Sequence, residues 1–203
     1  MRKVIVTNVV TLDGMFSGPN GEIIDLRSTG SEFDDYNAER ARAASTLLLG
    51  RDSWEGFRSA FGVIPKEPAD PEDKTDQVNR LFAGLLQDLD KVVVSDSLPE
   101  TVEGNWPETK VVRRADAHGV VDELRRRADG GDILIFASHY LWNDLLAAGL
   151  VDELHLTYGP YVFGGGVPAF TGGLTDRLRL LDITPYLGSD AFLVRYAARN
   201  ARA

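Results

Sequence analysis

Unbroken apolar runs recur along the first two thirds of the chain. The runs IVTNVV, TLLL, VVV and ILIF have little polar alternation, which is typical of strands covered on both faces. We predict strands at Val4 to Val10, Thr46 to Leu49, Lys91 to Ser95, Lys110 to Arg113 and Ile133 to Phe136. Three later strands, at Glu153 to Tyr158, Leu178 to Thr184 and Ala191 to Tyr196, alternate instead, so Glu153, His155 and Thr157 are expected on a wetter face.

Between these strands, apolar residues recur with helical spacing. Stripes at 33–44, 78–89, 120–128 and 141–148 predict helices; expected N-terminal caps are Ser31 with Asp34 as a capping box, Asp116 and Ser138. Helices alternating with strands predict an α/β sandwich whose mixed, mainly parallel sheet ends in an antiparallel hairpin. The length fits one domain, 1–203, with an irregular insertion at about 62–76 that is either a lid or a surface excursion.

Polar turns follow three of the expected strands. Gly50, Arg51 and Ser53 follow one, Ser95 and Asp96 a second, and Ala137 and Ser138 a third. Ligands of open α/β sheets bind at the carboxyl ends of the strands, where helix N-termini present free backbone N–H groups to anions. The turns are therefore expected to converge on an anionic ligand, although an ordinary strand–helix crossover without a ligand fits each single turn equally well.

Composition and charge narrow the choice of partners. A net charge of −9 argues against nucleic acid or an anionic membrane as the main partner. The absence of cysteine and of an apolar leader or spanning segment favours the cytoplasm. His118, His139 and His155 lack ligand spacing, so we expect no metal, and we place His139 and His155 on the surface. The tryptophans are expected in the core or at its rim: Trp54, Trp106 and Trp142.

Several motifs resemble a known family. They are Thr11–Gly14, Leu49–Trp54, Val92–Ser95, Gly149–Leu154, Gly159–Gly166 and Phe170. Nearly the whole chain resembles the reductase domain of the riboflavin-biosynthesis deaminase–reductases, which has the dihydrofolate reductase fold. The resemblance implies a three-layer sandwich and a nicotinamide cofactor, usually NADPH, whose pyrophosphate lies between the Gly50–Ser53 and Ala137–Ser138 turns. The expected cofactor-binding residues are Gly50, Arg51, Ser53, Ser95, Asp96, Ala137, Ser138, Leu141 and Gly165.

Two residues depart from the family pattern. Ala137 stands where glycine is usual, and its methyl group approaches the expected cofactor path. Asp96 stands where the family tends to place Arg, Thr or Ser near the adenosine 2′-phosphate, and its carboxylate would repel that group. Lys110, Arg113 and Arg114 are available to compensate. Use of NADH in place of NADPH therefore stays open.

The expected activity is hydride transfer to a C=N or C=O carbon, as in reduction of a ribosylamino-pyrimidine. Asp13, in the loop after the first strand, is the candidate catalytic residue that orients substrate or relays a proton; its alternative role is that of a turn residue. Glu32, Asp34 and Asp35 open the next helix, where the helix dipole alone favours acids. The rival functions are reduction of a pterin or other heterocycle and a non-catalytic, dimeric nucleotide-binding protein.

A homodimer is expected from the last two strands. Edge strands with apolar side chains need a cover, and a second copy of the chain supplies one. The side chains expected to point partly outward are Leu181, Tyr186, Phe192 and Tyr196.

Overall fold

The computed structural model describes residues 1–63, 72–172 and 178–198. Its strands are β1 (Val4–Thr11), β2 (Met15–Ser17), β3 (Ala44–Gly50), β4 (Asp90–Val94), β5 (Lys110–Val112), β6 (Asp132–Phe136), β7 (Glu153–Gly159), β8 (Val167–Pro168), β9 (Arg179–Pro185) and β10 (Phe192–Ala197). Its α-helices are α1 (Ser31–Ala43), α2 (Arg51–Phe61), α3 (Lys74–Gln87), α4 (Ala117–Arg126) and α5 (His139–Ala147). Single 3₁₀ turns lie at Leu26–Thr29 and Arg114–Asp116.

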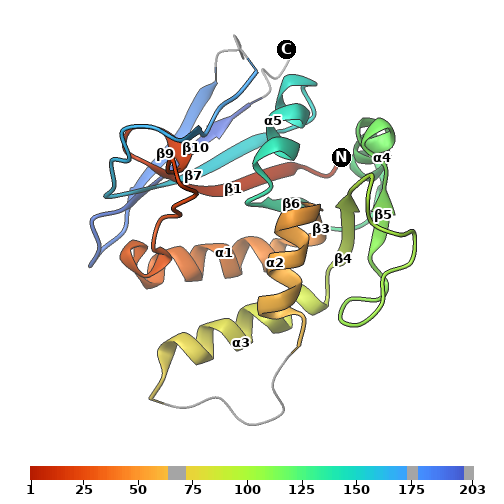
Figure 1. Cartoon of the computed structure of the whole chain (residues 1–203), viewed down its shortest axis with the longest axis horizontal. Helices are drawn as coiled ribbons and strands as arrows, with labels where there is room; N and C mark the ends of the chain where they lie inside the picture. Colours follow the sequence, from red (N-terminus) through yellow and green to blue (C-terminus); the bar gives the residue numbers. More distant parts are fainter. Residues whose placement is uncertain (64–71, 173–177, 199–203) are drawn as a thin grey trace.

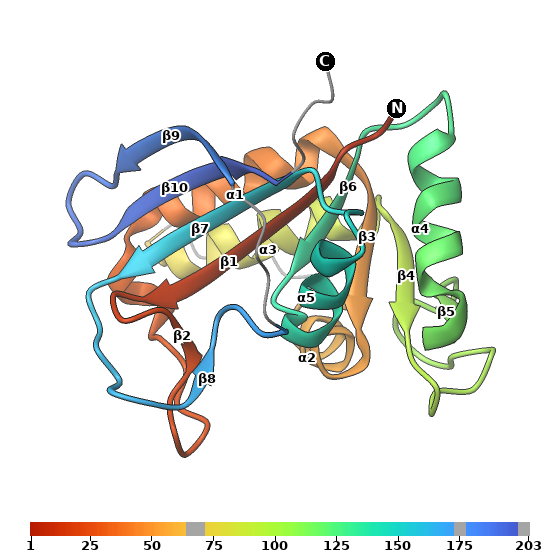
Figure 2. The ribbon, with the colours of Figure 1, turned by 90° about the horizontal axis from the view of Figure 1, so that it is seen from above.

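The main sheet is mixed and mainly parallel. Its strand order is β5-β4-β3-β6-β1-β7-β10-β9, and only the pairs made by β10 are antiparallel. β2 and β8 form a separate two-stranded sheet beyond the carboxyl end of β1 (Figure 2). The hairpin of β9 and β10 therefore lies at one edge, as its sequence pattern predicts.

Helices cover both faces of this sheet (Figure 1). On one face, α4 and α5 pack on side chains such as Val6, Ile133 and Ile135. On the other face, α2 and α3 pack on Leu47, Leu134 and others, beside α1. The unbroken apolar runs thus face a helix layer on each side, which is the physical reason for their composition. The predicted three-layer sandwich is confirmed.

β7 differs from its prediction. Its second face is not wet, because α1 lies over it: His155 is 0% exposed and Thr157 1%. Tyr186, expected to point partly outward, is likewise buried against Phe33 and Tyr36 of α1. Alternation along the strand indicated two different faces but did not reveal that a helix covers the second one.

The helix starts differ from the expected caps. α1 begins at Ser31 itself with Gly30 as the cap residue, so Ser31 and Asp34 form no capping box. Asp116 stands at the N-cap of α4 without a side-chain cap bond, because a 3₁₀ turn leads directly into the helix. α3 already starts at Lys74, so the irregular segment expected at 62–76 is shorter than predicted, and residues 64–71 lie outside the described chain.

The aromatic residues of the core agree with their prediction. The three tryptophans are buried, at 1% for Trp54, 4% for Trp106 and 0% for Trp142. They pack inside the two helix layers and are not stacking platforms at the surface.

Candidate cofactor and substrate site

The three polar turns meet at one edge of the sheet. β4, β3 and β6 are parallel neighbours, so their carboxyl ends lie side by side. Arg51, at the start of α2, donates a hydrogen bond from Nη1 to Ser97 Oγ at 3.2 Å, which connects the first turn to the second. Ser53 Oγ accepts from the backbone N–H of Ser138 at 2.8 Å, which connects the first turn to the third. The predicted convergence of the three strand ends is therefore present.

Ser53 and Ser138 cross-connect their turns. The Ser138 N–H donates to Ser53 Oγ, and the Gly50 N–H donates in return to Ser138 Oγ at 3.1 Å. The expectation that Ser138 caps its own helix through its hydroxyl is wrong, because the residue adopts a left-handed conformation (φ 48°, ψ 44°) that directs Oγ toward Gly50. Each hydroxyl thus positions the neighbouring turn.

Ala137 and Ser138 are both left-handed. Their φ angles are 47° and 48°, in the region that glycine adopts most easily. Asn8 of β1 supports this turn by donating from Nδ2 to the Ala137 carbonyl at 3.0 Å. Asn8 was not among the predicted site residues, although a polar side chain inside an otherwise apolar strand was an available signal.

Glycine and leucine complete the turn region. Gly50 has an ordinary φ of −77°, and a Cβ there would stand 4.0 Å from the Leu141 Cβ, so Leu141 packs against it from α5. Leu141 is 9% exposed and belongs to the core. Gly165 lies in the β7–β8 loop, where a Cβ would meet nothing within 4 Å. Its neighbour Gly166 (φ 120°) requires glycine, since a Cβ would stand 2.1 Å from the Ser17 carbonyl oxygen.

Ser95 and Asp96 have separate partners. Ser95 is buried, and its Oγ accepts from the backbone N–H groups of Ser97 and Leu98, which shapes the turn after β4. The Asp96 side chain is 59% exposed; it accepts from the Arg114 N–H at 2.9 Å and lies 3.6 Å from Arg114 Nε.

Of the three basic residues expected to compensate for Asp96, only Arg114 contacts it. Arg113 instead donates to the carbonyls of Ser95 and Leu98, and Lys110 lies toward the opposite end of β4, in a cavity with Asp88 and Asp90.

Asp13 joins two loops at the same edge. Its carboxylate accepts from the Thr11 hydroxyl at 2.5 Å, from the Gly164 N–H at 2.8 Å and from the Phe163 N–H at 3.2 Å. These donors, the Thr11 hydroxyl first, hold the pKa of Asp13 below its ordinary value. The side chain is thus ionised at neutral pH and suited to accept hydrogen bonds.

Asp34, in the first turn of α1, is a further acid with a shifted pKa. It is half-buried on α1, and burial, with a contribution from Asp35, raises its pKa. A carboxyl group with a raised pKa is suited to donate a proton. Sequence analysis grouped Asp34 with ordinary first-turn acids, because spacing does not show which of them a fold buries.

The two histidines expected at the surface are buried. His139 is 5% exposed, stacks on Phe16 with ring centroids 4.8 Å apart, and has Nε2 at 2.8 Å from the Pro168 carbonyl. It thereby attaches the small sheet to α5. His155 belongs to a different network on β7. Within the described residues, no group of three or more His, Cys, Asp or Glu side chains is arranged to hold a metal ion.

Comparison with known proteins extends this description. The RibD C-terminal domain family matches residues 2–190. The chain belongs to the RibD C-terminal domain family. Membership makes it a nicotinamide-dependent oxidoreductase by class, which favours the enzyme over the non-catalytic alternative.

One sequence relative and two solved structures illustrate the similarity. The uncharacterised protein YwjB of Bacillus subtilis (strain 168) is 25% identical over 179 residues, covering 88% of each chain. A candidate riboflavin biosynthesis protein from Shewanella sp. PV-4 superposes with a TM-score of 0.67 at 19% identity, covering 98% of this chain and 99% of that one. Dihydrofolate reductase from Enterococcus faecalis, in complex with NADP(H), gives 0.59 at 14% identity, covering 96% and 95%. The dihydrofolate reductase-like fold follows from these superpositions.

The residues at the strand ends of this RibD-family chain fit a dinucleotide. The first turn of α5 presents backbone N–H groups that have no acceptor within the helix, and the Arg51 side chain is 48% exposed beside it. Both features favour binding of the negatively charged pyrophosphate of a dinucleotide cofactor. Among the helices that the structure describes, none combines the length and the apolar content of a membrane span.

Proposed function

We propose that the protein reduces a ribosylamino-pyrimidine, in the manner of 5-amino-6-(5-phosphoribosylamino)uracil reductase of riboflavin biosynthesis. The observation that supports this most directly is the junction of the Gly50–Ser53 and Ala137–Ser138 turns by the Ser53–Ser138 hydrogen bond. The junction holds the two turns together where parallel strands end, which is where α/β folds bind their ligands, and it therefore supports a cofactor site at this edge. Membership of the RibD C-terminal domain family supports the choice of substrate class.

The proposed roles divide between holding the cofactor and orienting the substrate. A bound reduced nicotinamide supplies the hydride. Arg51 and the α5 N-terminus hold its pyrophosphate, while Ser53 and Ser138 keep the two turns together. Asp13, ionised and fixed by three donors, accepts hydrogen bonds from the amino groups of an aminopyrimidine and so orients its reacting carbon.

NADPH is the proposed cofactor, with NADH as the alternative. Asp96 disfavours a 2′-phosphate, but it already interacts with Arg114, whose guanidinium is 81% exposed and free to turn toward an added phosphate. The preference between the two cofactors depends on which of these charges faces the ribose.

A second candidate is reduction of a pterin. The half-buried acid Asp34 on α1 supports it, because a carboxyl group with a raised pKa protonates ring nitrogens well. The likeness to dihydrofolate reductase supplies only the fold and does not choose between the substrates.

We further propose a cytoplasmic homodimer built from one domain per chain. The outer strand β9 exposes apolar side chains, including Leu181 at 37% and Ile183 at 54%. Phe192 and Tyr196 of β10 are half-buried. An apolar edge strand of this kind needs a partner to prevent open-ended pairing.

The test measures oxidation of NADPH and NADH by the purified chain. The substrates to compare are 5-amino-6-(5-phosphoribosylamino)uracil and dihydrofolate. We expect turnover of the first, and a large loss of kcat in Asp13→Asn but not in Asp122→Asn, a half-buried acid on α4 that pairs with Arg126 and serves as the control. Turnover of dihydrofolate alone would favour the pterin reductase. If neither cofactor binds at millimolar concentration, both reductase proposals fail.

A further inference from the structure

A groove separates α1 from the C-terminal hairpin, away from the cofactor turns. It has a volume of about 580 Å³, within the usual range of small-molecule sites. Tyr36 and Arg40 line it from α1, and Tyr186, Leu193 and Arg195 line it from the hairpin. The groove exists because β9 and β10 extend the sheet beyond the width that α1 covers.

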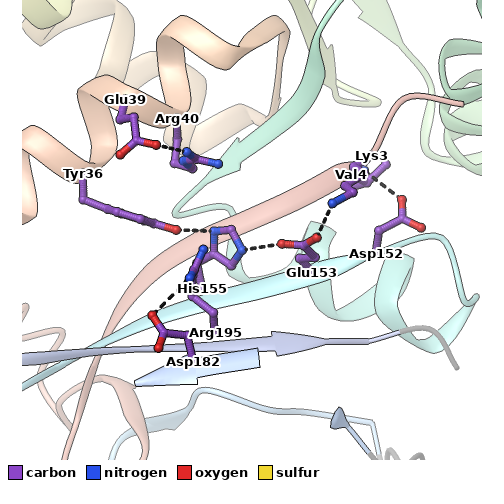
Figure 3. A network of polar contacts seen from close by, with 10 residues as sticks. All are labelled: Lys3, Val4, Tyr36, Glu39, Arg40, Asp152, Glu153, His155, Asp182 and Arg195. Atoms are coloured by element: carbon purple, nitrogen blue, oxygen red, sulfur yellow. Dashed lines mark hydrogen bonds and ion pairs between the residues drawn. The ribbon is translucent and has the colours of Figure 1, made fainter. Parts of the chain in front are cut away.

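Tyr36, which lines the groove, ends a line of hydrogen bonds that runs through His155 and Glu153 to Lys3 (Figure 3). Its hydroxyl lies 2.7 Å from Nδ1 of the fully buried His155. His155 Nε2 lies 2.9 Å from Glu153 Oε2, and Lys3 donates to Glu153 Oε1 at 2.7 Å. The side-chain polar atoms of His155 and Glu153 in this line all have partners. His155 therefore fixes the direction of the Tyr36 hydroxyl.

The charges of this line determine where its protons lie. The hydrogen bond from His155, with the added effect of Lys3, lowers the pKa of Glu153 to about 2 despite burial, so this carboxylate is ionised. Burial lowers the pKa of His155, so its ring is neutral. An ionised Glu153 requires the ring proton on Nε2, and Nδ1 therefore accepts from Tyr36. The Tyr36 oxygen is left to accept hydrogen bonds from whatever enters the groove.

Two guanidinium groups border the same end of the groove. Arg40 pairs with the exposed Glu39 and lies over the Tyr36 ring, 5.5 Å from its centroid. Arg195 pairs with Asp182 at 3.0 Å. In the described part of the chain, Nε of each arginine is buried and has no acceptor. A ligand cannot reach these buried Nε atoms, but the side chains are 19% exposed for Arg40 and 34% for Arg195, and their exposed guanidinium N–H groups are suited to a carboxylate or phosphate.

Acidic residues occupy the other end. Glu32 and Asp35 also line the groove, as does Glu39, which is paired with Arg40. The separation of eight positions between Glu32 and Arg40 corresponds to roughly 12 Å along the helix. A ligand is thus favoured when its anionic group faces the arginines and its hydrogen-bond donors face Tyr36 and the acids.

We propose that this groove binds a small organic anion, a phosphate or carboxylate that also carries hydroxyl or amino donors. Arg40 and Arg195 hold the anionic group, and the Tyr36 oxygen accepts a hydrogen bond from a neighbouring donor. The proposal uses none of the residues assigned to the cofactor, so it stands independently of the proposed reductase activity.

Nuclear magnetic resonance of the arginine Nε–H groups of the full chain tests this directly. Buried Nε–H groups exchange slowly with water, so the Arg40 and Arg195 signals are observable. Titrants at constant ionic strength are glycerol 3-phosphate, glycerate, inorganic phosphate and, as the neutral control, glycerol. We expect both signals to shift saturably, with dissociation constants on the order of millimolar, for the anions only. Comparison of glycerol 3-phosphate with glycerate tells whether phosphate or carboxylate is preferred.

Variants assign the binding to the groove. Arg40→Gln and Arg195→Gln should each weaken glycerol 3-phosphate binding about tenfold, whereas Arg126→Gln on the exposed face of α4 should leave it unchanged. Tyr36→Phe should weaken binding of glycerol 3-phosphate but not of sulfate, titrated in the same way, because sulfate has no hydrogen-bond donor at neutral pH to offer the Tyr36 oxygen.

Several results would overturn the proposal. One is a linear drift of the arginine Nε–H signals with anion concentration, equal to the drift that chloride causes. Another is binding of glycerol as strong as that of glycerol 3-phosphate. The third is a loss of glycerol 3-phosphate binding in Arg126→Gln as large as the loss in Arg40→Gln. If a groove variant unfolds, the saturable shift in the unaltered chain still decides the question. NADPH binding, measured in the same samples, bears on the reductase proposal and not on this one.

Discussion

Replacing Ala137 by glycine should stabilise the protein. Ala137 is held at φ 47° between β6 and α5, while its carbonyl accepts a hydrogen bond from Asn8. A left-handed conformation brings the Cβ of an L-residue close to the following carbonyl oxygen. Glycine has no Cβ, so the variant relieves this strain without removing the backbone hydrogen bond.

The magnitude follows from two opposing effects. Relief of the left-handed conformation contributes about 1–2 kcal/mol to the free energy of unfolding. The greater freedom of glycine in the unfolded chain costs about 0.4–1 kcal/mol. The net gain is about 0.8 kcal/mol, within limits of about 0 to 1.6 kcal/mol, and for a protein of this length about 0.8 kcal/mol raises Tm by roughly 2–3 °C.

Thermal and urea unfolding followed by tryptophan fluorescence measure this change, since all three tryptophans are buried. The matched control is Ala60→Gly, at an exposed position inside α2, where the same substitution should lower stability by about 0.5–1 kcal/mol. If Ala137→Gly lowered Tm as much as Ala60→Gly does, the assignment of strain to this turn would be refuted.

Four further outcomes are expected. Ser53→Ala should weaken nicotinamide dinucleotide binding, measured by calorimetry, by about 1 kcal/mol, because it removes the hydrogen bond that holds the Gly50–Ser53 turn against the Ala137–Ser138 turn. Asp96→Arg should shift preference toward NADPH by about 1–3 kcal/mol, and an unchanged ratio of the two dissociation constants would show that this side chain faces away from the ribose. Ile183→Lys should convert the proposed homodimer to monomers in light scattering, whereas Leu81→Lys, at an exposed apolar position on α3, should not. The pKa of Glu153 is lower in the folded than in the unfolded protein, so its ionised carboxylate stabilises the fold fully above about pH 4.5, and this stabilisation is lost as the pH falls toward 2. The free energy of unfolding of Glu153→Gln should therefore lack this loss between about pH 4.5 and 2.

Periodicity in the chain was sufficient to predict most of the architecture. Unbroken runs such as ILIF marked strands between two helix layers, and the helical stripes marked the helices that cover them. These patterns are local, since each records whether a short segment is covered on one side or on both. The order of polar turns also predicted that Gly50, Ser95 and Ala137 would meet, because parallel strands place their carboxyl ends at one edge.

Details that depend on partners distant in the sequence were not predictable in this way. Ser138 carries a strong cap signal, yet its hydroxyl pairs with Gly50, 88 positions away in the sequence. In a strand with one exposed face, the His155 side chain would point toward water. In the structure it is completely buried and hydrogen-bonded to Tyr36, 119 positions away in the sequence.

The sequence by itself therefore determined which segments form the layers and which turns share an edge of the sheet. Only the tertiary structure decided which polar side chains are buried, which direction their protons point and where a groove remains open beside α1. The reason is physical: propensity and hydrophobic period act over a few residues, whereas the burial and pairing of a polar group depend on which distant element packs over it.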